Sequence, residues 1–75
     1  MKYNLYSLNE TQIRDLCKDK LFDKKCTEII IKKIIYDFSI SAIANDLGLT
    51  TQAIYKRIAK IKVKLKIRKW TDSLE

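Results

Sequence analysis

The chain has 75 residues, 47% of them hydrophobic and 33% charged, and a formal net charge of +7. This length fits one domain, residues 1–75, near the lower size limit for a self-sufficient core, and the aliphatic content excludes a disordered chain. No apolar run reaches the roughly 18 residues of a membrane span, and the segment MKYNLYSLNE lacks the apolar core of a signal peptide. We therefore expect a cytoplasmic protein.

Few residues are suited to metal or catalytic chemistry. Cys17 and Cys26 are the only cysteines, and histidine is absent, so a zinc site of ordinary type would lack ligands. Both cysteines are predicted to be reduced and partly buried, with a disulfide as the alternative. Because the chain also lacks a phosphate-binding glycine loop and a convincing carboxylate pair, we expect no enzyme, no metal and no cofactor.

The positive charge is concentrated near the carboxyl end. Before Lys56 the basic and acidic residues nearly balance. The stretch from Lys56 to Lys69 has no acid and contains the basic residues Lys56, Arg57, Lys60, Lys62, Lys64, Lys66, Arg68 and Lys69. A solvated helix face is one explanation, but a one-signed run beside a recognisable motif favours a polyanionic partner.

The first predicted helix covers residues 10–19. Asn9 can cap it, and Gln12 three residues later completes a capping box. Leu8 and Ile13 occupy the two positions of a hydrophobic staple.

A second helix is predicted after Asp23, its plausible cap, over the segment KCTEIIIKKIIYDF at residues 25–38. The β-branched residues of this segment suit a strand by propensity. Paired lysines between paired isoleucines nevertheless repeat at helical spacing, which favours a largely buried helix.

A helix-turn-helix is predicted over about residues 39–60, where the sequence IANDLGLTTQAIYKRI contains the only glycine of the chain. Ser39 caps the first of its helices and Thr50 the second. Gly48 ends the first helix, because glycine adopts the left-handed conformation there without steric cost. Ala44 allows the two helices to cross closely. An ordinary helical hairpin is the alternative.

The segment FSISAIANDLGLTTQAIYKRIAKIKVKLK, from Phe38 to about Leu65, resembles region 4 of bacterial sigma factors and the related modules of response regulators and small plasmid or phage repressors. The resemblance implies DNA binding through the second helix, with Thr50 capping it and reaching a phosphate. It also implies base-facing roles for Thr51, Gln52, Tyr55 and Lys56.

Helical periodicity leads to nearly the same residues. One stripe, which must face the core, consists of Ile54, Ile58, Ile61 and Leu65. The opposite side presents Gln52, Tyr55, Lys56 and Ala59. Gln52 can pair with adenine in the major groove, Tyr55 can pack on a thymine methyl group, and Lys56 suits guanine or phosphate.

Together these patterns predict an all-α, four-helix domain that binds double-stranded DNA in a sequence-specific manner, as a transcriptional regulator of bacterial, plasmid or phage type. The residues predicted to contact phosphates are Ser39, Ser41, Thr50, Arg57 and Lys60. One alternative is a protein-interaction module, such as a small factor that binds RNA polymerase. Another is membrane-surface association through the basic carboxy-terminal stretch with Trp70.

The basic tail, about residues 60–75, shows two competing periods. Alternating apolar and basic residues after Ile61 fit a half-buried strand, whereas the lack of a turn residue after Thr50 favours a continued helix, which we predict. On that helix Val63, Ile67 and Trp70 would form a second apolar stripe, the predicted contact of a homodimer. In the alternative, the tail folds back over the first helix of its own chain.

Overall fold

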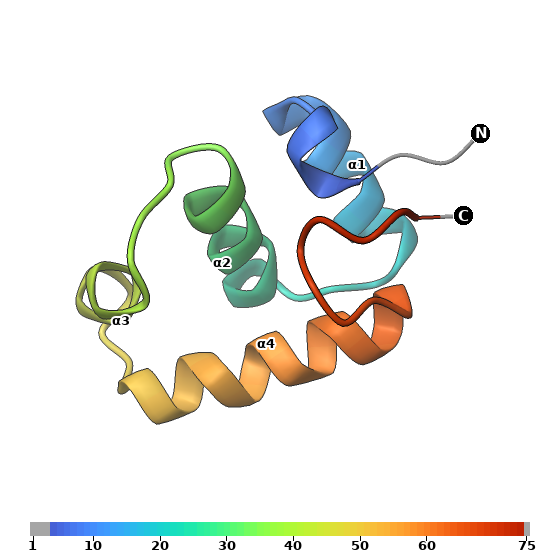
Figure 1. The fold of residues 1–75 in the computed structure, drawn as a ribbon. Coiled ribbons are helices and arrows are strands. Elements are labelled where there is room, and N and C mark those ends of the chain that lie inside the picture. Colours follow the sequence, from blue (N-terminus) through green and yellow to red (C-terminus); the bar gives the residue numbers. More distant parts are fainter. Residues whose placement is uncertain (1–3, 75) are drawn as a thin grey trace.

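The computed structural model describes residues 4–74, which contain four α-helices and no strand. The short 3-10 helix η1 (Leu5–Ser7) precedes α1 (Glu10–Asp19), α2 (Lys24–Ile34), α3 (Ile40–Leu47) and α4 (Thr51–Leu65), as Figure 1 shows. The predicted all-α fold with four helices is confirmed. Within residues 4–74, no helix is both long enough and apolar enough for a bilayer crossing.

Each α-helix begins at a polar side chain that accepts a hydrogen bond from the backbone three residues later, which satisfies one of the unpaired donors of the first turn. The four capping residues are the predicted ones, Asn9, Asp23, Ser39 and Thr50, with bonds of 2.8, 2.8, 3.2 and 3.1 Å. The capping box at Asn9 is also complete, since Gln12 accepts from the Asn9 N–H at 2.9 Å. Local hydrogen bonding thus fixes all four helix starts.

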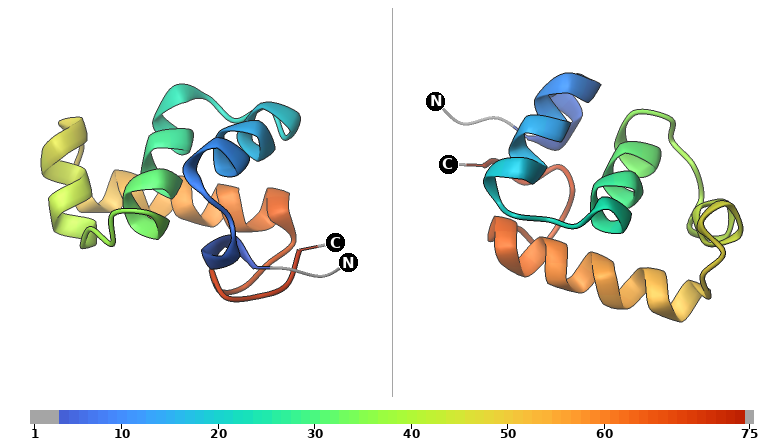
Figure 2. Two further views of the ribbon diagram at one scale, coloured as in Figure 1. Left: turned by 90° about the horizontal axis from the view of Figure 1, so that it is seen from above. Right: turned by 180° about the vertical axis from the view of Figure 1, so that it is seen from behind.

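Helix α2 lies at the centre of the domain. It packs against α1, α3 and α4, and Figure 2 shows it crossing α4 with α1 and α3 on its two sides. Its consecutive residues Ile29, Ile30 and Ile31 are all buried. Because successive helical residues point about 100° apart, three buried neighbours mean that more than half of the circumference of α2 is covered.

The turn between α3 and α4 has the predicted geometry. Gly48 is left-handed, with φ of 66°, and Leu49 donates its N–H to the Ala44 carbonyl at 2.9 Å. This is the bonding of a Schellman motif, in which the apolar residue after the left-handed position packs back on the domain. Leu49 does so, as it is half-buried against the core.

The same ending recurs after α1 and α4, but without glycine. Leu21 and Lys66 take the left-handed position, with φ of 59° and 58°. In each case the next residue donates its N–H to the carbonyl five residues earlier, at 2.9 Å for Phe22 and 3.0 Å for Ile67. Phe22 packs against the core, and Ile67 lies within it. The left-handed conformation costs a residue other than glycine about 1–2 kcal/mol, which the burial of the following apolar side chain offsets.

Helix α2 is shorter than predicted. It ends at Ile34, whereas the sequence favoured a helix through Phe38. Asp37 adopts a left-handed backbone with φ of 54°, and Ser39 is extended because it caps α3. The chain must therefore leave the helix before these residues, and Phe38 lies outside α2 with an exposed side chain.

The carboxy-terminal segment also departs from prediction. Helix α4 ends at Leu65, so the predicted helical stripe of Val63, Ile67 and Trp70 does not form. Ile67 is only 6% exposed within the core of its own chain, and Trp70 is partly buried there, whereas Val63 is 76% exposed. Figure 1 shows the tail turning back on the domain, close to the alternative expected from the sequence. Homodimerisation remains a prediction, but without this contact surface.

Gly48→Ala and Leu21→Gly should shift stability in opposite directions. An added Cβ at Gly48 meets nothing within 4 Å, so Gly48→Ala should cost only the strain of the left-handed backbone, about 1 kcal/mol. Leu21 is 83% exposed and left-handed, so Leu21→Gly should remove strain with little loss of burial and stabilise by up to about 1 kcal/mol. Urea unfolding measures the change in unfolding free energy of both variants. Changes of the same sign would contradict the left-handed backbone conformation at these two positions.

Ile67 and Val63 give a second contrast. Ile67→Ala should destabilise the protein by about 2–4 kcal/mol, because it leaves a cavity in the core. Val63→Ala should change the unfolding free energy by no more than about 0.5 kcal/mol, because the side chain is exposed. Thermal and urea unfolding of both variants provide the measurement, and a small effect at Ile67 would mean that the tail is not folded on the core.

Candidate nucleic-acid interface

Helix α4 has one covered side and one open side. Its covered side consists of the predicted stripe Ile54, Ile58, Ile61 and Leu65, all buried. In Figure 1 the other helices and the returning tail all lie on this side of α4, and no other part of residues 4–74 covers the opposite side of the helix. The helix has 15 residues, is about 22 Å long and contains no acid, so its open side combines basic residues with uncharged ones.

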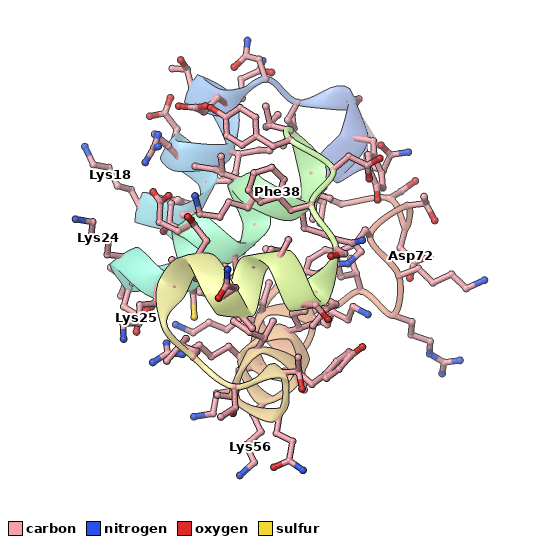
Figure 3. The ribbon with its side chains drawn as sticks, turned by 90° about the vertical axis from the view of Figure 1, so that its left-hand side faces the viewer. Lys18, Lys24, Lys25, Phe38, Lys56 and Asp72 are labelled. Carbon is pink, nitrogen blue, oxygen red and sulfur yellow. The ribbon has the colours of Figure 1, made fainter. Side chains whose placement is uncertain are left out.

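The four predicted base-facing residues gather at the amino-terminal end of this open side. Thr51, Gln52, Tyr55 and Lys56 are all exposed, and 59% of the Tyr55 surface is accessible. Figure 3, viewed from the α3 side, shows Lys56 extending away from the domain beyond α4. These side chains are thus free to contact a partner, and the chemistry they offer is mixed: hydroxyl, amide, phenol and ammonium.

The backbone at the start of α4 adds donors to the same surface. The N–H groups of Thr51 and Gln52 belong to the first turn and have no intrahelical acceptor. The Thr50 oxygen accepts from Ala53, which leaves its O–H available as a donor. Together with the positive end of the helix dipole, these groups favour an anion such as a phosphate.

The serines predicted to contact phosphates lie elsewhere. Ser39 and Ser41 are exposed at the amino-terminal end of α3, one helix length, or about 12 Å, from the turn that leads into α4. The Ser39 oxygen is engaged in capping α3, as Thr50 is at α4. The structure therefore brings Thr50 together with the base-facing residues but places the two serines at a separate position.

Arg57 does not point freely into solvent. Its guanidinium forms an ion pair with Asp23, the cap of α2, with an Nη1–Oδ2 distance of 3.0 Å. The backbone N–H of Cys26 and the Arg57 guanidinium hold the pKa of the Asp23 carboxyl well below its usual range, at about 2. Arg57 thus connects α4 to the start of α2, a contact that the sequence did not indicate.

A groove lies between the start of α2 and the flank of α4. Its volume is about 390 Å³, and its lining residues are Asp23, Cys26, Ala53, Lys56, Arg57 and Lys60. Lys60, a predicted phosphate contact, is exposed at its edge. Figure 3 shows Lys24 and Lys25 at the start of α2, extending sideways from the domain, whereas Lys56 extends beyond α4.

Both cysteines are free and buried, as predicted. Burial raises the pKa of both thiols. The pKa of Cys26 is raised even though the Arg57 guanidinium lies 3.7 Å from the Cys26 sulfur. The reactive thiolate form is therefore disfavoured at both positions. The two residues serve as small apolar side chains in the packing between helices.

Comparison of the chain with protein families, with curated proteins and with solved structures finds no match. The resemblance to sigma region 4 therefore remains a prediction from the motif. What the structure does establish is the arrangement of that motif: two helices joined by a tight glycine turn, with the second helix open along its outward side.

Asp23 should make folding stability depend on pH. Its pKa is about 2 in the folded protein against 3.8 for a free side chain. A depressed pKa contributes stability that is complete above about pH 4 and is lost as the pH falls through about 2. Asp23→Asn keeps a good helix cap but removes the titrating carboxyl group. The unfolding free energy of this variant should therefore fall less steeply between pH 4 and pH 2 than that of the parent.

Asp15→Asn is the matched control, since it removes the same charge from an exposed position on α1. Urea unfolding at several pH values provides the measurement. If the parent and Asp23→Asn show the same pH dependence, the ion pair and the capping bond at Asp23 do not contribute in solution.

Proposed function

We propose that this protein binds double-stranded DNA in a sequence-specific manner and acts as a small transcriptional regulator in the cytoplasm. The observation that carries the proposal is the open side of α4, a basic helix without an acid that follows a tight turn and starts with exposed polar side chains. Such a helix fits the major groove, which is wide enough to admit one helix.

The first turns of α4 would read the bases. Gln52 can donate and accept at the same time, which matches the adjacent acceptor and donor of adenine. Lys56 can donate to guanine, and Tyr55 can pack against a thymine methyl group or bond a phosphate. Ala59 is small and exposed on the same side, so the duplex can approach the helix closely.

Contacts to phosphates would supply most of the affinity without specifying sequence. Lys60 is the best placed of the predicted phosphate contacts, because it is exposed one turn beyond Lys56 on α4. Thr50 and the backbone donors beside it would bind a second phosphate at the start of the helix. Binding of this kind weakens steeply with salt, and no catalytic step is involved.

A second candidate function is protein recognition by the same helix, for example of RNA polymerase. The exposure of Val63 beside Ala59 favours it, because apolar side chains on an open helix face are common at protein contacts. This alternative predicts that duplex DNA is not retained at physiological salt. Selection of bound sequences from a random duplex library distinguishes the two: enrichment of one motif supports base reading, and no enrichment argues against it.

Gln52→Ala and Lys60→Ala should have different effects on DNA binding. Gln52→Ala should cost about 1–3 kcal/mol on the selected site and reduce discrimination at one base pair, with little effect on random DNA. Lys60→Ala should weaken all sequences similarly and lower the slope of log K against log salt by roughly one. Fluorescence anisotropy on selected and random duplexes measures both.

Each variant can fail its assigned role separately. Unchanged affinity of Gln52→Ala for the selected site would exclude Gln52 as a base reader. A loss at Lys60 that depends on the base sequence would contradict a phosphate contact there.

A further inference from the structure

A cavity of about 430 Å³ lies at the carboxy-terminal end of α4, away from the residues that would read bases. Its lining residues are Lys20, Lys64, Leu65, Lys66 and Ser73. They come from the loop after α1, from the last turn of α4 and from the returning tail, so the cavity exists only because the tail folds back. Among residues 4–74, the lining contains three lysines and no acidic residue.

Lys64 is held in place within this cluster. Its ammonium group donates to the Lys20 carbonyl at 2.9 Å and lies 5.3 Å from the centre of the Phe22 ring. These contacts fix a long, flexible side chain before any ligand binds, which reduces the entropy lost on binding. The ammonium group has three donors and uses one of them on the carbonyl, so two remain.

The charge of this cluster differs from that at other basic positions of the domain. Arg57 faces Asp23, and Lys32 forms an ion pair with Asp46 at 2.7 Å. By contrast, the cavity adds the hydroxyl of Ser73 to its lysines, and no residue of the described range 4–74 contributes a carboxylate to its lining. Several ammonium groups with a neutral hydroxyl donor suit an anion with several acceptor oxygens.

We propose that Lys20, Lys64, Lys66 and Ser73 form a phosphate-binding site. The phosphate can belong to the backbone of a duplex or to a free phosphorylated molecule, because the recognising chemistry is the same. The position along α4 favours the duplex, an assignment that rests on the proposed function. Lys56, Lys60 and Lys64 follow one another at steps of four residues, about 6 Å each, so a row of lysines along one flank of α4 leads from the proposed base-reading residues to the cavity.

Two variants test the site without disturbing the fold. Lys66→Asn removes a charge at a position with left-handed backbone. Apart from glycine, asparagine is the residue type that tolerates this backbone conformation best. Lys20→Gln removes the charge of an exposed side chain but keeps the backbone carbonyl of residue 20, which accepts the hydrogen bond from Lys64. Lys18→Gln is the matched control, an exposed lysine of α1 outside the cavity lining.

The first measurement is the salt dependence of duplex binding. Each cavity variant should lower the slope of log K against log salt by about 0.9 on selected and random duplexes alike, while Lys18→Gln leaves it unchanged. Shortening the flanks of the duplex should abolish the difference between the parent and Lys66→Asn, because the contacted phosphate would then be missing.

The second measurement is an NMR titration with inorganic phosphate and pyrophosphate in the absence of DNA. One outcome is saturable shifts at the amides of residues 64–67 and 73 that disappear in Lys66→Asn. If the salt slopes of duplex binding are unchanged as well, the result would support a site for a free phosphorylated ligand. Unchanged slopes and no saturable shifts overturn the proposal. If the parent does not bind duplex at all, the proposed function fails, and this titration alone then decides whether the site exists.

Discussion

The structure depends on the burial of α2 by every other helix. A chain of 75 residues can build only one small core, and here consecutive isoleucines of α2 supply its centre. Each such side chain contributes about 1.5–3 kcal/mol when it is fully removed from water, but only if a neighbour covers it. Since the buried residues Ile29 to Ile31 point in three directions, α1, α3 and α4 must pack around α2 on different sides. The directions of these side chains thus determine where the other helices lie.

This arrangement explains why α4 has two different sides. The helix contributes one apolar stripe to the core around α2, and no further element of residues 4–74 lies beyond it. Its remaining side chains therefore face solvent, and lysine and threonine are suited to that environment. The same geometry that completes the core leaves a basic helix accessible along its length. Packing and the proposed recognition surface are consequences of one helix position.

The sequence predicted the helix starts because capping is local: the side chain of Asn9 or Thr50 bonds a backbone group only three residues away. It also predicted the turn at Gly48, where glycine marks the left-handed residue. It missed the end of α4, because Lys66 adopts the same conformation without being glycine. Burial of Ile67 compensates the strain, and that burial depends on core residues far away in the chain. The pairing of Arg57 with Asp23 spans 34 residues and was unpredictable for the same reason.

In the proposed complex with DNA, the ion pair between Asp23 and Arg57 would also influence the lifetime of the complex. A phosphate that approaches Arg57 has to compete with a carboxylate already 3.0 Å from the guanidinium. On a matching site, the proposed base contacts would hold the helix in place during this exchange, whereas on random DNA no base contact would offset the cost of separating the ion pair. The carboxylate of Asp23, by competing with phosphate for Arg57, would then shorten the lifetime of mismatched complexes more than that of matched ones. The search for a site would then be faster than the net charge alone suggests.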